Sequence, residues 1–269
     1  MLRRLLFASV LLLAACGGDA EEEAEENAVR QAPAETLYRD ARASFAAKAY
    51  NQAMEEFEEI ERQHPYSDWA RRGQIMAAYS AYRAGKFDDM VGIVERFVKL
   101  YPTDTQTPYA YYLKALGYYT QISDVGRDQQ KTSQAREALK EVIARYPETK
   151  YAQDAKLKLD LTDDHLAGKE MEVGRYYLKQ KEYLAAINRF KFVVDHYQTT
   201  SHTAEALHRL VECYLRLGIV GEAKTYAAVL GHNYPGSDWY KYSYAMMKGN
   251  LSPEEKKSVF DPYRELLPL

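Results

Sequence analysis

Residues Lys99-Leu100-Tyr101-Pro102 close a helical stretch of this 269-residue chain, and four other tetrapeptides repeat their pattern. Proline lacks a backbone donor and clashes with the preceding helical turn, so such a tetrapeptide is expected to end a helix. The other copies are Arg62-Gln63-His64-Pro65, Ala144-Arg145-Tyr146-Pro147, Asp195-His196-Tyr197-Gln198 and His232-Asn233-Tyr234-Pro235. Their successive spacings of 37, 45, 51 and 37 residues indicate five copies of one structural unit.

The first two units align in one register at the spacing of 37 residues. The alignment pairs Phe45 with Tyr82, Tyr50 with Phe87, Ala53 with Met90, Phe57 with Val94 and Ile60 with Phe97. A helix, a tight turn near Lys48 or Gly85 and a second helix in this register are typical of the tetratricopeptide repeat (TPR). Because one helix pair cannot bury its apolar face alone, neighbouring pairs must share a core. The sequence predicts an all-α, right-handed TPR solenoid of about five helix pairs, with one elongated helix and a C-terminal cap.

Two of the spacings are longer than 37 residues. The eight extra residues of the third unit fall in Ile122–Ser133, which we predict to be a longer loop between its two helices. The fourteen extra residues of the fourth unit fall within Tyr151–Tyr177, where the apolar rhythm of a helix continues. Fourteen residues make almost four helical turns, so we expect one long helix with Gly168 as its weakest point.

The N-terminus has the pattern of an export signal. Arg3 and Arg4 precede an apolar run from Leu5 to Ala15, and the run ends in Leu13-Ala14-Ala15-Cys16. A positive start, a short apolar region and small residues before a cleavage point predict a secretory signal peptide. The cysteine after them makes a lipobox, although a plain signal peptide with an incidental cysteine is the alternative. We therefore expect a signal peptide over 1–15, a lipidated Cys16 with an acidic flexible tether over 16–34, and the solenoid over 35–269.

The net charge and the spacing of the histidine and aspartate residues argue against nucleic-acid binding, catalysis and metal binding. Without Arg3 and Arg4 the mature chain carries 34 basic and 39 acidic side chains, which does not favour nucleic acid as a partner. His202 and His208 lie six residues apart, on different faces of a helix, and consecutive residues such as Asp163-Asp164-His165 diverge. We predict no catalytic residue, metal site or cofactor. With Cys16 lipidated, Cys213 lacks a disulfide partner and is expected to be a small buried apolar residue.

Tyrosine is unusually abundant, with 24 copies. The repeat register places several aromatic residues and two arginines on the first helices of units one to three. The predicted groove residues are Tyr38, Arg42, Arg72, Tyr79, Tyr109 and Tyr112. Tyrosine and arginine together complement an extended peptide with an aromatic, carboxylate-bearing end. The alternative is that these aromatic residues belong to the core, because Phe45, Tyr82 and Tyr119 share the register position nearest the next helix.

Three segments carry a resemblance to a known family. They are Val125-Gly126-Arg127-Asp128-Gln129, the stretch Leu166–Tyr177 with Gly168-Lys169-Glu170-Met171 at its start, and Ala185-Ala186-Ile187-Asn188-Arg189-Phe190. With the lipobox and the repeats, the chain resembles the BamD family, the lipoproteins of the outer-membrane β-barrel assembly machinery. The resemblance implies a non-enzymatic scaffold that is lipid-anchored in the outer membrane and faces the periplasm.

The resemblance also implies partners and their places. They are the periplasmic POTRA domains of BamA, other Bam lipoproteins and unfolded outer-membrane proteins. Residues 35–148 would form the substrate-groove units and residues 149–269 the partner-docking units, with BamA contacting Arg189. The alternative for Arg189 is an ordinary exposed charge or a helix-surface ion pair.

Two other functions remain open at this point. One is a different envelope TPR protein, such as a Tol-Pal partner, because Tyr146–Ala152 also fits the repeats of that class. Those proteins usually carry a coiled coil before the repeats and lack a lipobox. The other is an enzyme with accessory repeats, which would need a separate catalytic domain.

Two departures from the repeat pattern are His64 in an aromatic position and Gln198 in place of proline.

Overall fold

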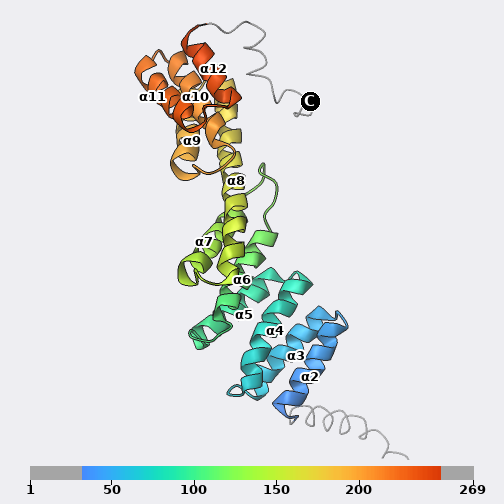
Figure 1. Cartoon of the computed structure of the whole chain (residues 1–269). Helices are drawn as coiled ribbons and strands as arrows, with labels where there is room; N and C mark the ends of the chain where they lie inside the picture. Colours follow the sequence, from blue (N-terminus) through green and yellow to red (C-terminus); the bar gives the residue numbers. More distant parts are fainter. Residues whose placement is uncertain (1–31, 250–269) are drawn as a thin grey trace, which may run out of the picture. The chain divides into compact units, whose positions relative to one another are not determined.

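The computed structural model describes residues 32–249, which form eleven α-helices and no β-strand (Figure 1). The helices are α2 (Ala34–Ala46), α3 (Tyr50–Gln63), α4 (Asp68–Ala84), α5 (Phe87–Leu100), α6 (Thr107–Thr120), α7 (Gln130–Arg145), α8 (Lys150–Lys179), α9 (Tyr183–His196), α10 (Thr203–Arg216), α11 (Val220–Asn233) and α12 (Asp238–Met247). They divide into two compact units, residues 32–114 and 115–249, with the boundary inside α6. The predicted all-α fold of five helix pairs and a cap is confirmed.

Four of the five helix pairs turn at a residue with left-handed backbone geometry. The φ angles are 64° at Lys48, 76° at Gly85, 64° at Lys181 and 75° at Gly218. Only glycine adopts such angles without a steric cost, so the two lysines are strained where the two glycines are not. The tight turns predicted at Lys48 and Gly85 are therefore confirmed.

The second helix of every pair ends with one shared geometry. The C-cap residues are His64, Tyr101, Tyr146, Tyr197 and Tyr234, with φ between −134° and −129° and ψ between 45° and 62°. Each donates its backbone N–H to the carbonyl four residues earlier. Tyr197 keeps this geometry although Gln198 follows it, so the ending does not depend on proline at that site.

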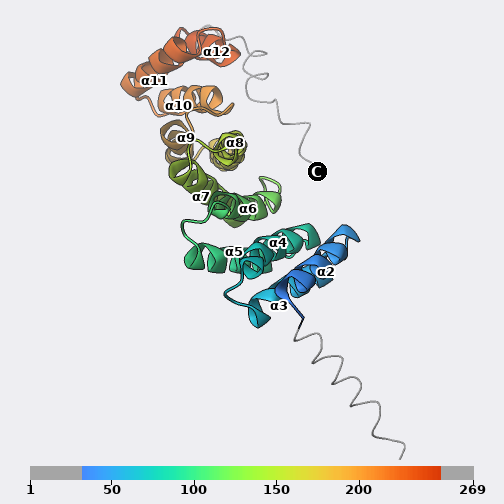
Figure 2. The same ribbon diagram turned by 60° about the horizontal axis from the view of Figure 1, so that its bottom comes forward.

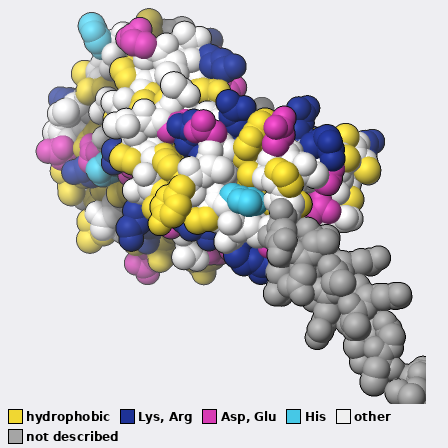
Figure 3. Space-filling model, turned by 90° about the horizontal axis from the view of Figure 1, so that it is seen from below, with side chains coloured by type: hydrophobic (Ala, Val, Ile, Leu, Met, Phe, Trp, Pro, Cys, Tyr) yellow, Lys and Arg dark blue, Asp and Glu magenta, His cyan; other side chains and the backbone are white. Residues whose placement is uncertain are grey.

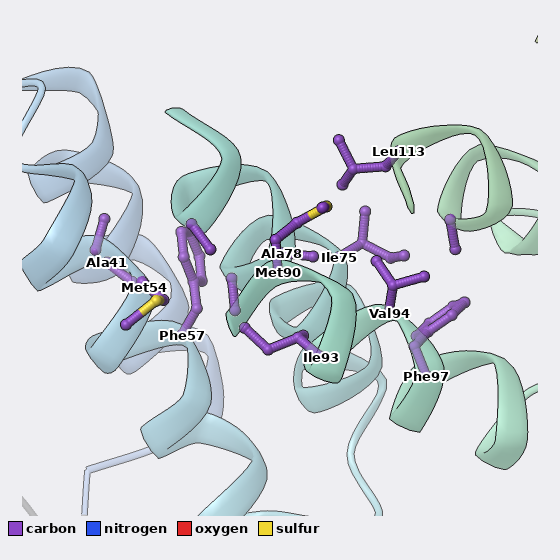
Figure 4. Packing of buried hydrophobic residues seen from close by; sticks show 14 of the residues in the cluster. Ala41, Met54, Phe57, Ile75, Ala78, Met90, Ile93, Val94, Phe97 and Leu113 are labelled. Carbon is purple, nitrogen blue, oxygen red and sulfur yellow. The ribbon is translucent and has the colours of Figure 1, made fainter. Parts of the chain in front are cut away.

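The first unit is held together by side chains from α2 to α6 that meet in one interior (Figure 4). Phe57, Met90 and Phe97 are fully buried there. Burial of one such side chain stabilises the fold by about 1.5–3 kcal/mol. Buried alanines, such as Ala41 and Ala53, leave space for the helices to approach closely. The core therefore combines large residues from one helix with small residues from its neighbours.

The second unit is built around α8, a single helix of 30 residues. The predicted long helix is confirmed, and α7 and α9 both pack against it (Figure 2). The helix passes unbroken through Gly168, the expected weak point. A Cβ atom there would lie 3.2 Å from His202 Nε2 and 3.7 Å from the methyl groups of Val125. The glycine therefore allows two other segments to approach α8 closely.

The long loop between α6 and α7 covers residues 121–129. The sequence predicts that the loop extends to Ser133. This boundary is wrong by four residues, because α7 already begins at Gln130. Gly126 N–H donates to Asp124 Oδ1 at 2.8 Å, and Lys169 Nζ on α8 donates to Gly126 O at 3.3 Å. These contacts hold the loop against the middle of α8.

The cap is formed by α12, which packs against α10 and α11. His208 of α10 is fully buried beneath it, with Nδ1 in a hydrogen bond with Ser243 Oγ at 2.8 Å. The Trp239 ring lies 5.2 Å from the His208 ring, centre to centre. Among residues 32–249, no helix combines the length and the apolar character that a membrane span requires.

Candidate functional site

An aromatic strip runs between α2 and α4, and we define it by Tyr38, Phe45, Trp69 and Tyr79. The ring centres of Tyr38 and Trp69 lie 5.0 Å apart, and those of Phe45 and Tyr79 lie 5.5 Å apart. All four residues are partly buried and pack on the core of the first unit. The inner faces of these rings therefore stabilise the fold, and their outer edges remain available to a ligand.

Three exposed arginines accompany the strip: Arg42 on α2, and Arg72 and Arg83 on α4. The Arg72 guanidinium lies 5.2 Å from the Trp69 ring centre, and Arg83 stacks on aromatic rings at the other end of α4. Within residues 32–249, none of the three pairs with a carboxylate. Most other arginines do, including Arg71, Arg96, Arg136, Arg189 and Arg209. The strip therefore carries positive charge that the described part of the chain leaves uncompensated.

The six predicted groove residues divide into three kinds. Tyr38, Tyr79 and Tyr109 pack on the core while keeping part of their surface exposed. Arg42 and Arg72 are exposed, and Tyr112 is half-buried. Tyr38 and Arg42 lie on α2, Arg72 and Tyr79 on α4, and Tyr109 and Tyr112 on α6. Tyr38 and Arg72 both lie next to Trp69. The tyrosines of the strip pack on the core, as the alternative expects, and keep part of their surface exposed, so their role in a groove stays a prediction.

Sequence reasoning missed Trp69 and Arg83. Both follow the spacing of the predicted residues, because Trp69 lies three positions before Arg72 and Arg83 lies four positions after Tyr79. Residues at these spacings share one face of a helix. The helical period could therefore have identified both.

The second candidate surface surrounds Arg189 on α9. A shallow pocket of about 450 Å³ is lined by Glu170, Tyr177, Ala185, Asn188, Arg189 and Phe192. Arg189 Nη1 lies 3.1 Å from Glu170 Oε2, and the Arg189 side chain is 45% exposed. The Phe192 side chain beside it is 42% exposed. Arg189 therefore points outward and pairs with Glu170 of α8, while its role as a partner contact stays a prediction.

The aspartate, histidine and cysteine side chains of α8 and α10 serve separate structural roles. Asp163 pairs with Arg136, while Asp164 accepts hydrogen bonds from the backbone and hydroxyl of Ser201. Burial, followed by the charge of Arg209, lowers the pKa of His208 to about 3. Burial raises the pKa of the Cys213 thiol to about 12, and this cysteine is fully buried as predicted. Residues 32–249 contain no group of three His, Cys, Asp or Glu side chains that could hold a metal ion.

Charges of both signs are interspersed on the face of the molecule shown in Figure 3, where basic side chains lie next to acidic ones. That face therefore has no extended surface of one sign. The predicted lipidation site Cys16, the signal peptide over 1–15 and most of the tether over 16–34 lie outside the described residues, as does the end of the chain from residue 250.

Several known proteins are similar to this chain. The family model described as "Outer membrane lipoprotein" (YfiO) matches residues 30–230. A Caulobacter vibrioides protein named outer membrane protein assembly factor BamD is 47% identical over 244 residues, covering 90% of this chain and 80% of that protein. A Rickettsia prowazekii protein of the same name is 46% identical over 247 residues, covering 92% and 98%. A solved TPR protein of Thermus thermophilus aligns with a TM-score of 0.37 at 19% identity, covering 80% of this chain and 99% of that one.

Proposed function

Because the chain belongs to the outer-membrane lipoprotein family that includes the BamD assembly factors, we propose that it is a non-enzymatic scaffold of the outer-membrane β-barrel assembly machinery. Membership of the family assigns the chain to outer-membrane protein assembly and to the outer membrane. Family membership supports this function over a Tol-Pal partner and over an enzyme with accessory repeats. We further propose that the protein has a substrate surface, a partner surface and a lipid anchor.

The proposed substrate surface is the aromatic strip with its arginines, within the substrate-groove units of residues 35–148. The observation that carries the proposal is the combination of partly exposed rings with three arginines that lack a carboxylate partner among the described residues. Unfolded outer-membrane proteins expose aromatic side chains and carboxylates. Such groups would gain apolar contact and charge-assisted hydrogen bonds on this surface.

The proposed partner surface lies in the docking units of residues 149–269, at the pocket around Arg189. Its arginine, amide and exposed phenylalanine offer a charged contact beside an apolar one. Protein interfaces favour arginine and aromatic residues in such positions. We assign this surface to the POTRA domains of BamA, and we expect other Bam lipoproteins to join the complex.

The proposed anchor is a diacylglycerol group on Cys16, followed by the acidic tether that ends at residue 34. An anchor with more than one acyl chain is stable, whereas a single chain gives only marginal attachment. The tether would allow the folded units to face the periplasm away from the lipid headgroups.

Peptide binding tests the substrate surface. A labelled peptide ending in an aromatic residue is titrated with the wild-type protein and with a double variant, Arg42→Gln with Arg72→Gln. Loss of hydrogen bonds to charged groups is expected to cost about 1.5–3 kcal/mol, so affinity should fall about tenfold or more. Arg96→Gln is the matched control, because Arg96 is exposed but pairs with Glu58 and Glu61 on α3. Equal affinities for the double variant and the control would exclude the strip as the substrate surface.

A further inference from the structure

The helix α12 ends in the same way as the first helix of a complete pair. Gly249 follows it with a φ angle of 71°, and its backbone N–H donates to Met246 O at 3.1 Å. In four complete pairs the turn residue has the same left-handed geometry and the same hydrogen bond to the carbonyl three residues earlier. These turn residues are Lys48, Gly85, Lys181 and Gly218. Each of them is followed two residues later by the start of a second helix, so the turn at Gly249 has the geometry that precedes one.

In a complete pair, three positions of the first helix face the second helix, and they lie three, seven and ten residues before the turn residue. At the first of these positions the ring centres of Phe45 and Tyr50 lie 5.4 Å apart, and at the third those of Tyr38 and Phe57 lie 5.4 Å apart. At the second position α8 has Gly174, on which a Cβ atom would lie 2.5 Å from the α9 side chain that it faces. The corresponding residues of α12, which we call the α12 face, are Met246, Tyr242 and Trp239.

The α12 face is less covered than the same positions in earlier pairs. In α4, Ile75 and Ala78 are 4% and 1% exposed, and in α10, His208 and Val211 are fully buried. All three residues of the α12 face are partly exposed, although α10 and α11 pack against this helix. Within Asp238–Met247 only Ser243 is buried, whereas α4 has eight buried residues and α10 has ten. A side of α12 that a second helix covers in other pairs is therefore open among the described residues.

The sequence that follows α12 carries the signals of a short helix. Ser252-Pro253 with Glu255 is typical of a helix start, because the serine caps the first turn and proline needs no backbone donor there. Pro262 predicts the end, since helices usually stop at or before the residue preceding a proline. The predicted helix, residues 253–261, would be about 14 Å long, which is close to the length of the ten-residue α12.

Phe260 is the side chain of this segment that suits the α12 face. It lies seven residues after Pro253, as Phe57 and Phe190 lie seven residues after the first residues of α3 and α9. Both of those phenylalanines are fully buried. The predicted helix begins two residues later after its turn than the second helices of the four complete pairs. This longer turn leaves room for Tyr242, which is larger than the alanine or glycine that α2, α4 and α8 have at its position.

We infer that residues 253–261 pack against the α12 face as the second helix of a sixth pair, with Phe260 on Tyr242. The chain itself is the favoured occupant, because its attachment at Gly249 keeps the segment next to this face at a high effective concentration. A second copy of the chain or another protein would have to lose its free translation and rotation to bind there. This pairing is independent of the proposed function.

The sixth pair would close the C-terminal end of the solenoid. On a helix over 253–261, the side opposite Phe260 carries Glu254, Glu255 and Ser258. The terminal repeat of a solenoid requires a polar outer surface to remain soluble. The segment would therefore replace partly exposed aromatic and methionine side chains with charged and hydroxyl groups.

Hydrogen–deuterium exchange followed by mass spectrometry tests the pairing on the full-length protein in detergent. Backbone amides of residues 256–261 should exchange at least about tenfold more slowly than in a free peptide of the same sequence. Phe260→Asp should abolish this protection and accelerate exchange in α12 by about tenfold, because both helices lose their contact. Ser258→Asp is the matched control, since it adds the same charge on the opposite side of the predicted helix. It should keep the protection of both segments, and peptides from α4 report whether the rest of the fold is intact.

A chemical cross-link identifies the occupant. Tyr242→Cys combined with Phe260→Cys should react with a short bis-maleimide within one chain, which gives a product of monomer mass on a denaturing gel. A product of dimer mass would place a second copy on the α12 face and overturn the inference. Absence of any cross-link, or exchange of residues 256–261 at the rate of the free peptide in the wild type, would show that the segment does not pack there. Equal protection in Phe260→Asp and the wild type would show that the segment is held by other contacts.

Discussion

At the scale of single residues, glycine sets how closely α8 and α9 approach. A Cβ atom on Gly174 would lie 2.5 Å from Cε1 of the fully buried Phe190. We predict that Gly174→Ala lowers the free energy of unfolding by about 1–3 kcal/mol, the usual cost of overpacking a core. Urea unfolding of the purified protein measures the change.

The matched control for Gly174 is Gly92, in the interior of α5. A Cβ atom there would meet nothing within 4 Å. Gly92→Ala should therefore raise stability by about 0.5–1 kcal/mol, because alanine is the better helix former. A similar change in both variants would mean that helix propensity, and not the contact with Phe190, governs position 174.

His208 makes stability depend on pH. Its pKa is about 3 in the folded protein, against 6.5 for an unperturbed histidine, because of its burial. As pH falls below 6.5 the unfolded chain binds a proton that the folded protein excludes, so stability is lost progressively down to about pH 3. The loss should reach about 2 kcal/mol between pH 6.5 and 5.

Urea unfolding at several pH values, with His208→Gln beside the wild type, isolates this effect. Burial raises the pKa of the nearby Glu212, which acts in the opposite direction, but Glu212 is present in both proteins. The variant should lose less stability than the wild type as pH falls. Parallel pH profiles would show that another group controls the acid sensitivity.

At the scale of elements, buried charged side chains connect α10 to its neighbours α8 and α12. Arg209 is 3% exposed and pairs with Glu205 and Glu212, while Glu205 also pairs with Arg175 of α8. The Arg209 guanidinium lies 5.4 Å from the ring centre of Trp239 on α12. The same cluster therefore fixes α8 on one side of α10 and the cap on the other.

We predict that Arg209→Met destabilises the second unit by about 3–5 kcal/mol, because it leaves two buried carboxylates without this partner. Lys241→Met is the control, since Lys241 and Asp238 form a fully surface-exposed pair. Thermal unfolding followed by circular dichroism compares the two. A small effect of Arg209→Met would indicate that the carboxylates take up protons or reach water.

The elements themselves were predictable because their signals are local. The endings at Tyr101 or Tyr146, the turn at Gly85 and the apolar rhythm of α8 each lie within one stretch of sequence. The contact between Tyr50 and Arg83 joins two helices across 33 residues, so no local pattern contains it. The sequence left core and groove open for Tyr79 for a related reason, because a ring on a helix edge can serve both.

At the scale of the whole molecule, partner binding should depend on Arg189. We predict that Arg189→Glu weakens binding to the purified POTRA region of BamA by about 2–5 kcal/mol, as expected for the loss of a buried charge pair at an interface. Arg145→Glu is the control, because Arg145 is exposed on α7 and pairs with Glu141. Isothermal titration calorimetry measures both. A dissociation constant for Arg189→Glu within twofold of the wild type would remove this residue from the interface.

Attachment to the membrane should depend on Cys16. We predict that Cys16→Ser yields a folded protein that a high-salt wash releases from membranes, because the lipid would be its anchor. Cys213→Ser should stay attached, since that cysteine is buried in the core of the second unit. Cell fractionation followed by immunoblotting distinguishes the two. Firm retention of Cys16→Ser after the wash would place the anchor elsewhere.

The shared geometry of the five C-caps makes the helix pairs exchangeable in principle. His64 and Tyr101 leave the chain in nearly the same backbone state, and the stretch 65–101 between these two joints has 37 residues. An in-frame duplication of that stretch would return the chain to an equivalent joint without interrupting a helix. Genes of this architecture can therefore change their number of helix pairs by recombination at the caps, and the binding surface can grow or shrink by whole repeats.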